Sequence, residues 1–312
     1  MMTTKESFLI MDMGGTNVRL AVVEGGQPVA LKKYKVADFK NFYDLLDDYK
    51  KKVETFPDTF LMALPTPFKG DKIHLINNPW SFQVSVLKKR YGFKDIRSLN
   101  DFEAVSMALP YLKKRDVIQV GKGTAVSGEP KLVLGAGTGL GVGIWTPERV
   151  LSSEGGHLTV PFSKKERDLQ DFLVKKCKGH VSVERLVSAQ GLENIYSYLS
   201  KGKGLTSFEI LDRAEAGDRT AEKSILLLLR FLGRVAGDLA LVVKPLGGVY
   251  FCGGVLQHPV VLRLLDDSKF LEEFNDKGRR SDLLLTIPKY LIIHQCVAFL
   301  GLSHFFDKKV QK

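Results

Sequence analysis

Apolar and polar residues near the N-terminus follow a pattern that predicts three β-strands joined by tight turns. Two apolar segments, FLIMD and VRLAVVE, flank the turn GGTN within residues 7–24. A second turn, EGGQ, follows at 24–27, and a third strand is expected over 28–36. Apolar residues then recur at helical spacing over 41–53, which predicts a helix there.

A similar order of elements returns in the middle of the chain. A strand is expected at 131–134, followed by the glycine-rich turn GAGTGLGVG and by strands at 142–145 and 149–152. Helices are expected at 164–177, 192–200, 207–216 and 220–243, before a strand at 249–252. Because strand, glycine turn, two strands and helices occur twice, we expect two similar α/β lobes with a cleft between them.

The polar pair Asn100-Asp101 stands between the two repeats, at a junction of elements. A strand is expected at 96–99 and a helix from near Phe102, so the pair lies where the strand ends and the helix begins. A helix N-terminus favours an ionised carboxylate. Asp101 is therefore either a functional carboxylate or a plain N-cap of the helix.

The composition is that of an ordinary globular protein, and the cysteines and N-terminal segment indicate the cellular compartment. Of its 312 residues, 44% are hydrophobic and 26% are charged, and apolar runs fall short of the ~18 residues that span a bilayer. The N-terminal segment lacks the pattern of a signal peptide. Cys177, Cys252 and Cys296 lie far apart, which is typical of reduced thiols rather than a disulfide framework or a zinc site. We expect a cytoplasmic protein without a membrane partner.

The net charge of +11 admits two kinds of anionic partner. A positive field attracts nucleic acid, and it also attracts a polyanionic substrate such as ATP. The basic residues form short, scattered clusters and do not fall in a known nucleic-acid-binding motif. We therefore expect solvated helix faces and no nucleic-acid partner.

The first glycine turn combines a carboxylate with groups that suit a phosphate. Asp12 ends the first strand, Gly14 and Gly15 let backbone N–H groups approach an anion, and Thr16 and Asn17 add side-chain donors. Asp12 is also placed to hold Mg²⁺ through water. The alternative is a hairpin turn whose aspartate caps backbone amides.

Two further glycine turns have a related character. The second contains Gly137, Thr138 and Gly139; it is not a Walker loop, because no Lys-Ser/Thr pair follows, and a strand rather than a helix follows it. The third, Gly253-Gly254, ends a buried strand and could let an adenine lie against the backbone. A simple strand-to-helix turn explains this pair equally well.

These three turns, in this order, resemble the actin-like ATPase and sugar-kinase superfamily, and within it the bacterial glucokinase family. The resemblance extends through nearly the whole chain. It is carried by DMGGTNVRLA, NNPWSF, LNDFEAVSMALP, LGAGTGLGVGIW, EGGHLTVPF, HVSVERLVSAQGL, VYFCGGV and DKGRR. It implies two RNase H-like lobes around a central cleft, with a small lobe at 1–112 plus 298–312 and a large lobe at 113–297.

The resemblance also implies an activity: the ATP-dependent phosphorylation of glucose to glucose 6-phosphate, the first step of glycolysis. Asp101 would be the catalytic base for the sugar 6-hydroxyl. The implied sugar contacts are Asn100, Asp101, Glu154, His157 and Glu184. The first two turns would hold the phosphates of ATP, with Mg²⁺ bound to Asp12 through water, and the third turn would hold the adenosine. A homodimer is expected by analogy.

Some residues depart from the family pattern or fit more than one role. Ala189-Gln190 stands where the family has Gly-Pro, and residues 295–299 replace an Asn-Pro-Gly-type segment. Lys277 and Arg279 either approach the nucleotide or belong to a surface loop. Three alternatives to a glucokinase are a kinase of a related hexose, a DNA-binding sugar sensor and a structural ATPase. The EGGH and LNDF segments argue against the last, and the early position of the first turn leaves no room for an N-terminal DNA-binding domain.

Overall fold

The computed structural model describes residues 7–14, 17–65, 70–75 and 78–307, and the chain divides into two compact units. Unit 1 comprises residues 1–112, 148–150 and 295–312. Unit 2 comprises residues 113–147 and 151–294. Gly15 and Thr16 of the first predicted phosphate turn lie outside the described residues. In the described part of the chain, no helix is long and apolar enough to cross a membrane.

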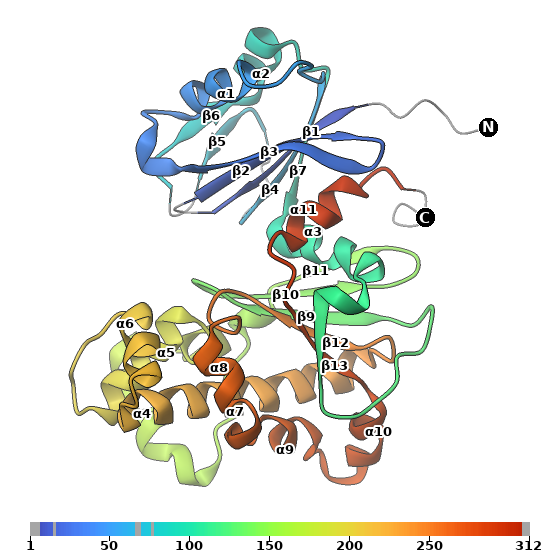
Figure 1. The fold of residues 1–312 in the computed structure, drawn as a ribbon. Helices are drawn as coiled ribbons and strands as arrows, with labels where there is room; N and C mark the ends of the chain where they lie inside the picture. Colours follow the sequence, from blue (N-terminus) through green and yellow to red (C-terminus); the bar gives the residue numbers. More distant parts are fainter. Residues whose placement is uncertain (1–6, 15–16, 66–69, 76–77, 308–312) are drawn as a thin grey trace. The chain divides into compact units, whose positions relative to one another are not determined.

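Unit 1 is built on a five-stranded sheet with the order β3-β2-β1-β4-β7 (Figure 1). Its strands are β1 (Phe8–Met13), β2 (Asn17–Glu24), β3 (Gln27–Lys35), β4 (Thr59–Leu64) and β7 (Asp95–Asn100). The first three form an antiparallel meander, as the sequence predicts, whereas β4 runs parallel to both β1 and β7. A parallel strand inside a sheet is covered on both faces, which explains why β4 has the apolar sequence TFLMAL.

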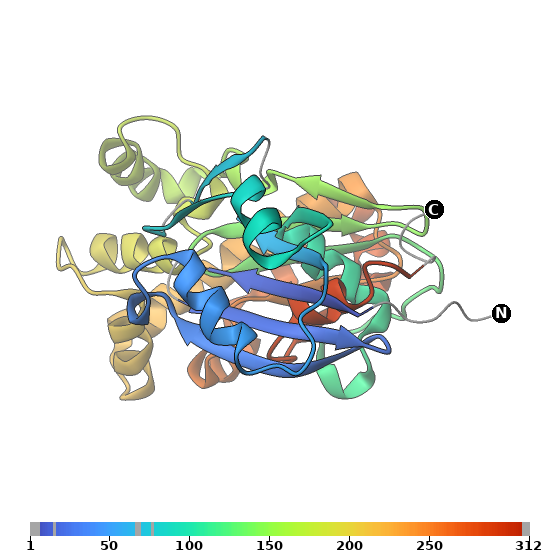
Figure 2. The ribbon, with the colours of Figure 1, turned by 90° about the horizontal axis from the view of Figure 1, so that it is seen from above.

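Helices cover both faces of this sheet (Figures 1 and 2). On one face lie α1 (Phe42–Lys50) and α2 (Val84–Tyr91), with the short hairpin β5 (Lys72–His74) and β6 (Ser81–Gln83). On the other lie α3 (Asp101–Ala108) and α11 (Val297–Ser303). A Cβ on Gly301 would overlap the carbonyl oxygen of Ala104, so α11 rests directly on the backbone of α3.

Unit 2 has a six-stranded sheet with the order β11-β10-β9-β12-β13-β8. Its strands are β8 (Val117–Val120), β9 (Lys131–Ala136), β10 (Leu140–Trp145), β11 (Val150–Ser153), β12 (Val249–Cys252) and β13 (Lys289–Ile292). As in unit 1, the first strand of the repeat pairs antiparallel with the second and parallel with the fourth. Once β8 is set aside, the two sheets share one strand order, which confirms the duplication that the sequence predicts.

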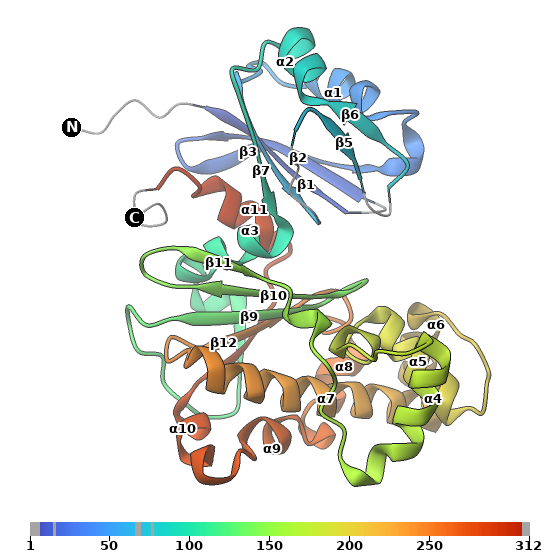
Figure 3. The same ribbon diagram turned by 180° about the vertical axis from the view of Figure 1, so that it is seen from behind.

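The helices of unit 2 pack around one long central helix (Figure 3). They are α4 (Arg167–Cys177), α5 (Ala189–Leu199), α6 (Ser207–Glu215), α7 (Arg219–Val243), α8 (Pro259–Leu264), α9 (Phe270–Asn275) and α10 (Ser281–Thr286). Helix α7 runs along the sheet, and its Gly233 and Gly237 touch the carbonyls of Phe270 and Phe274 in α9. The main apolar core of unit 2 lies between α7 and the sheet.

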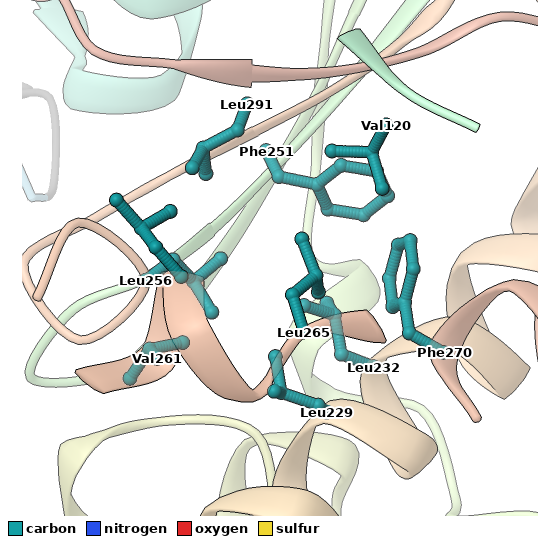
Figure 4. Close-up of a pocket in the computed structure, with 10 residues that line it drawn as sticks. Val120, Leu229, Leu232, Phe251, Leu256, Val261, Leu265, Phe270 and Leu291 are labelled. Carbon is teal, nitrogen blue, oxygen red and sulfur yellow. The ribbon is translucent and has the colours of Figure 1, made fainter. Parts of the chain in front are cut away.

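A small cavity lies in this core, between the sheet and helices α7, α8 and α9 (Figure 4). Its volume is ≈ 20 Å³. It is lined by Val120, Leu229, Leu232, Phe251, Leu256, Val261, Leu262, Leu265, Phe270 and Leu291. Apolar walls give a water molecule no hydrogen-bond partner, and the space is too small for a drug-sized ligand. We regard it as a packing gap rather than a binding site.

The structure contains short elements that the sequence pattern does not predict. Strands β5, β6, β8 and β13 have three or four residues each, too few to show an alternating pattern. The helix predicted over 164–177 begins later, at Arg167, after a 3₁₀ turn, η5 (Lys164–Glu166). The Ser163 N–H donates to the Glu166 carboxylate at 2.7 Å, and this capping interaction fixes the start of the turn.

One core position of β13 carries a charge. Lys289 is 1% exposed, and its Nζ donates to the carbonyl of Leu284 at 2.8 Å and to Oδ1 of Asn275 at 3.2 Å. The same Nζ lies 4.5 Å from the centre of the Phe274 ring. Burial lowers the pKa of Lys289 from 10.5 to about 8. Its charged form therefore destabilises the folded state.

The stability of the protein should rise with pH because of this lysine. An unfolded chain keeps Lys289 protonated up to pH 10.5, whereas the folded chain releases the proton from about pH 8. Between these values the unfolded state binds more protons, so folding is favoured as the pH increases. The full effect is about 3 kcal/mol. Urea unfolding of wild type and Lys289→Met at pH 7 to 10 checks this.

The wild-type curve should climb relative to that of the Lys289→Met variant, which lacks the titrating group. Below about pH 8 the difference between the two should be constant, because both states of the wild type are protonated there. Parallel curves across the whole range would contradict the assignment of a low pKa to Lys289.

Candidate functional site

The strand register of unit 1 places the predicted residues at one edge of the sheet. Asp12 of β1 pairs with Ala63 of β4, and the next residue of β4, Leu64, pairs with Asn100 of β7. These three strands are parallel, so their carboxyl ends meet at the same edge. The first predicted turn and the Asn100-Asp101 pair therefore lie two strands apart, about 10 Å at the usual strand spacing.

Asp12 is paired with a cation that the sequence analysis did not single out. Its cross-strand partner is Arg19 of β2, whose Nη1 donates to Oδ2 of Asp12 at 3.1 Å. Burial raises the pKa of the Asp12 carboxyl, while the charge and hydrogen bond of Arg19 act in the opposite direction. An arginine within the apolar strand VRLAVV is the signal that could have indicated this pair.

The described part of the first turn is closed by backbone and side-chain bonds. The N–H of Gly14 donates to the carbonyl of Asn17 at 3.0 Å. The amide of Asn78 reaches the carbonyl of Gly14 at 3.5 Å, and Oδ1 of Asn78 accepts from the N–H of Trp80 at 3.0 Å. Asn78 of the NNPWSF segment thus contacts the turn itself.

The N-cap of α3 is Asn100 rather than Asp101, so the plain N-cap alternative for Asp101 is wrong. Oδ1 of Asn100 accepts from the N–H of Phe102 at 2.8 Å, and the Glu103 carboxylate accepts from the N–H of Asn100 at 2.8 Å. The Asn100 amide also donates to the carbonyl of Pro65 at 3.0 Å. A capping box therefore fixes the start of the helix.

Asp101 is consequently the first residue of α3. Its Oδ1 accepts from the N–H of Phe102 at 2.9 Å. The positive end of the helix dipole stabilises a carboxylate in this first turn. The side chain is held at the end of the helix, at the same edge of the sheet as Asp12.

The second glycine turn connects β9 to β10 in unit 2. The N–H of Gly137 donates to the carbonyl of Gly139 at 2.9 Å, which makes the turn tight. The carbonyl of Gly137 accepts from the N–H of Ala189 at 2.8 Å, so the departure from the family pattern at Ala189 keeps the turn bonded. A Cβ on Gly137 would meet open space, and Thr138 is exposed.

Glu184 joins this turn to the predicted sugar segment. It lies in a 3₁₀ turn, η6 (Val183–Arg185), and its Oε2 accepts from the N–H of Leu140 at 2.9 Å. A Cβ on Gly139 would overlap the same oxygen, so a larger residue there would displace the carboxylate. The carbonyl of Glu184 accepts from Ser188 Oγ at 2.7 Å.

Glu154 precedes another 3₁₀ turn, η4 (Gly155–His157), which ends at His157 and packs against the start of β10. A Cβ on Gly156 would overlap the carbonyl oxygen of Leu140. The Nε2 of His157 lies 3.8 Å from Oε2 of Glu154, and the two side chains are 63% and 87% exposed. Because η4 also contacts η6, the structure brings Glu154, His157 and Glu184 together.

The third turn lies beside the second. Strand β12 runs parallel to β9, with Cys252 opposite Gly135, so both strands end at the same edge. Gly253 has a φ of +105°, and a Cβ on it would overlap the carbonyl of Ala136. A Cβ on Gly254 would meet open space. The eight predicted residues of unit 2 are therefore grouped where β9 and β12 end and β10 begins; they are Gly137, Thr138, Gly139, Glu154, His157, Glu184, Gly253 and Gly254.

Lys277 does not join this group. Its Nζ donates to the carbonyl of Arg234 at 3.0 Å and pairs with Asp238 at 2.8 Å, and its side chain is 9% exposed. Both partners lie on α7. The interpretation of Lys277 as a residue that approaches the nucleotide is therefore replaced by a structural role against α7.

Packing at Gly156 should be essential for the sugar segment. Gly156→Ala places a methyl group against the carbonyl of Leu140 and should lower the free energy of unfolding by about 2 kcal/mol, the usual cost of overpacking. Gly137→Ala, where the added Cβ meets open space, serves as the control. Urea unfolding measures both, and equal losses would mean that η4 does not rest on β10.

Comparison with known proteins gives consistent matches over almost the full chain. The family model described as Glucokinase matches residues 9–309. A glucokinase of Salmonella paratyphi B (strain ATCC BAA-1250 / SPB7) is 37% identical over 306 residues, 94% of each chain.

Solved structures agree with the sequence matches. The crystal structure of a glucokinase from an Antarctic psychrotroph has a TM-score of 0.84 at 29% identity and covers 96% of this chain and 98% of its own. A glucokinase from Balamuthia mandrillaris in complex with glucose has a TM-score of 0.80 at 18% identity, over 96% of this chain and 93% of its own. The predicted fold class is confirmed as the mixed α/β fold of actin-like ATPases and hexokinases. With a family model and a relative that each match nearly its whole length, the chain belongs to the glucokinase family.

Proposed function

We propose that this chain transfers the γ-phosphoryl group of ATP to the 6-hydroxyl of glucose and so carries out the first step of glycolysis. Membership of the glucokinase family supports the reaction. The observation that carries the mechanism is the position of Asp101, a carboxylate fixed at the first residue of α3 at the sheet edge that also bears Asp12.

Asp101 is the proposed catalytic base. The oxygen of the 6-hydroxyl forms a bond to the γ-phosphorus, the bond between that phosphorus and the β–γ bridging oxygen breaks, and ADP leaves. The proton of the hydroxyl passes to the Asp101 carboxylate. Phosphoryl transfer has a loose transition state, so orientation of the hydroxyl contributes more than basicity.

We assign the sugar contacts to Asn100, Asp101, Glu154, His157 and Glu184. Oε2 of Glu184 is bound to the N–H of Leu140, which pre-positions Oε1 for a sugar hydroxyl. The Asn100 side chain already accepts a hydrogen bond at Oδ1 and donates one from Nδ2 within unit 1. Its contact with the sugar would therefore use the second hydrogen on Nδ2. Carboxylates, an amide and an imidazole suit vicinal hydroxyls, each of which both donates and accepts. Such a site rejects sugars that leave these groups unpaired.

We assign the phosphates of ATP to the first two glycine turns and the adenosine to the third. Open space at Gly137 and Gly254 supports this assignment, because a ligand can approach the backbone there. The proposed phosphate contacts are Gly14, Gly15, Thr16, Asn17, Gly137, Thr138 and Gly139. Gly253 and Gly254 complete the nucleotide contacts.

Magnesium is the cation that this assignment requires, and Asp12 is the residue that would hold it through water. Oδ2 of Asp12 is bound to Arg19, and the carboxylate would hold the ion in addition to this pair. A divalent cation beside this carboxylate would oppose the effect of burial and keep it ionised. When bound, Mg²⁺ supplies charge neutralisation of the ATP phosphates.

We also propose that the protein is a cytoplasmic homodimer, without a nucleic-acid partner. The homodimer is inferred by analogy alone. The donor and the sugar are tested together by a coupled assay of ATP-dependent phosphorylation across glucose, mannose, fructose, galactose and N-acetylglucosamine. Preference for glucose is the expected result. Preference for another hexose would favour a related sugar kinase, and no turnover would contradict the proposal.

Replacing Asp101 by asparagine should abolish most turnover and leave the helix intact. The Oδ1 of an asparagine can still accept from the N–H of Phe102, so the start of α3 is preserved. Loss of the proton acceptor should lower kcat by about 10²–10⁴-fold. Glucose binding, measured by calorimetry, and the melting temperature should stay near wild type. Near-normal turnover would show that Asp101 has only a structural role.

Replacing Glu154 by glutamine should act on glucose binding. The substitution removes the charge-assisted hydrogen bond that the exposed Glu154 carboxylate would make to a glucose hydroxyl. The KM for glucose should therefore rise about tenfold, with the KM for ATP unchanged. Glu148→Gln, at an exposed glutamate of the loop before β11, is the matched control. An unchanged KM for glucose in Glu154→Gln would remove this residue from the site.

A further inference from the structure

Arg234 is a buried cation in the middle of α7 whose hydrogen bonds reach two other segments of unit 2. It is 9% exposed. Its Nε and Nη2 donate to Glu273 of α9 at 2.8 and 2.9 Å, and Nη1 and Nη2 donate to Glu166 at 2.7 and 3.0 Å. Nη1 also donates to the carbonyl of Pro161 at 2.8 Å. These bonds use all five N–H groups of the guanidinium.

Arg230, one helical turn earlier on α7, balances the charge of this cluster. Its Nε donates to Glu273 at 2.6 Å, and its Nη2 lies 3.6 Å from Glu166. Two arginines thus face two glutamates. Buried ion pairs of this kind often contribute no more stability than apolar residues of the same size, because desolvation opposes the attraction. The cluster therefore calls for an explanation other than stability.

The hydrogen bonds of Arg234 to Pro161 and Glu166, the first arm of the cluster, end on the segment that follows the proposed sugar contacts of η4. Pro161 and Glu166 lie four and nine residues after the end of η4. Between them and η4, the N–H of Val160 donates to the carbonyl of Val181 at 3.2 Å, and the carbonyl of Leu158 accepts from the N–H of Val183 at 2.8 Å. These bonds transmit the fixed position of Pro161 to both η4 and η6.

The hydrogen bonds of Arg234 to Glu273, the second arm, end on α9, which is also held to α7 by backbone contact. Gly233 and Gly237 of α7 touch the carbonyls of Phe270 and Phe274, so these two backbones are in contact. Glu273 adds its charge to an interface that close packing already defines. The segment of Pro161 and Glu166 is held to α7 by the guanidinium and by the ring of Phe162 against Phe231, and a capping bond from Ser163 lies within the segment.

We propose that Arg234 is a positioning residue for sugar binding: it fixes Pro161 and Glu166, and through them it sets the place of Glu154 and His157 at η4. The inference rests on the proposed function, because it assumes that these side chains contact glucose. In this proposal the two sets of hydrogen bonds made by the guanidinium affect different properties of the protein. The arm to Pro161 and Glu166 determines glucose affinity, and the arm to Glu273 contributes to helix packing alone.

The two arms can be tested separately. Arg234→Met keeps much of the side-chain length and removes all the hydrogen bonds of the guanidinium, including the one to Pro161. Glu273→Gln weakens the arm to α9 and leaves the bonds to Pro161 and Glu166 in place. Arg234→Met should raise the dissociation constant for glucose about tenfold, with that for ATP nearly unchanged. Glu273→Gln should lower the melting temperature and keep the wild-type affinity for glucose.

Calorimetric titration with glucose and with ATP, together with thermal unfolding, gives these readouts without relying on turnover. If Arg234→Met does not fold, Glu166→Gln is used instead; it should raise the glucose dissociation constant severalfold. If Arg234→Met, or Glu166→Gln in its place, binds glucose with wild-type affinity, the inference is overturned. So does an equal loss of glucose affinity in Glu273→Gln, because that result indicates general loosening. A wild-type protein that binds no glucose would instead contradict the proposed function itself.

Discussion

Direct backbone contact at glycine is the constraint on which both units depend. Gly301 lets α11 rest on α3, Gly156 lets η4 rest on the carbonyl of Leu140, and Gly253 lets the end of β12 touch Ala136. Any side chain at these positions would overlap a carbonyl oxygen. Backbone groups that meet in this way have little freedom to move apart, because interiors are close-packed. The polar side chains beside these contacts are therefore held on fixed supports, which a site for phosphate and sugar groups requires.

The fold could be predicted from the sequence where its patterns are long. Apolar segments separated by tight turns over 7–36 indicate the meander of β1, β2 and β3, and the return of strand, glycine turn and strand near residue 131 indicates the second sheet. The strands β5, β6, β8 and β13, of three or four residues each, could not be found in this way. Strand β13 illustrates the reason: one of its buried positions is Lys289, a charged residue that packing and two hydrogen bonds accommodate and that a hydrophobic pattern would exclude.

The site shows a similar limit. Residue types and motifs indicate Asp101, Glu154 and the glycine turns, because their chemistry is local to short segments. Partners that are distant in sequence stay hidden: Arg19 beside Asp12 depends on hairpin register, and the five bonds of Arg234 depend on how α7 meets two other segments. The choice of Asn100 as the N-cap, one residue before Asp101, also depends on side-chain geometry that sequence spacing does not specify.

The contact between α3 and α11 has a consequence for how the chain is made. Unit 1 takes its last helix from residues beyond 294, so the ribosome must finish all of unit 2 before α11 emerges. Throughout that interval α3 presents the backbone around Ala104 without the helix that later covers it. The half that is synthesised first is thus the half that is completed last. During translation, the nascent protein has an unfinished first unit attached to a second unit whose residues are all already available.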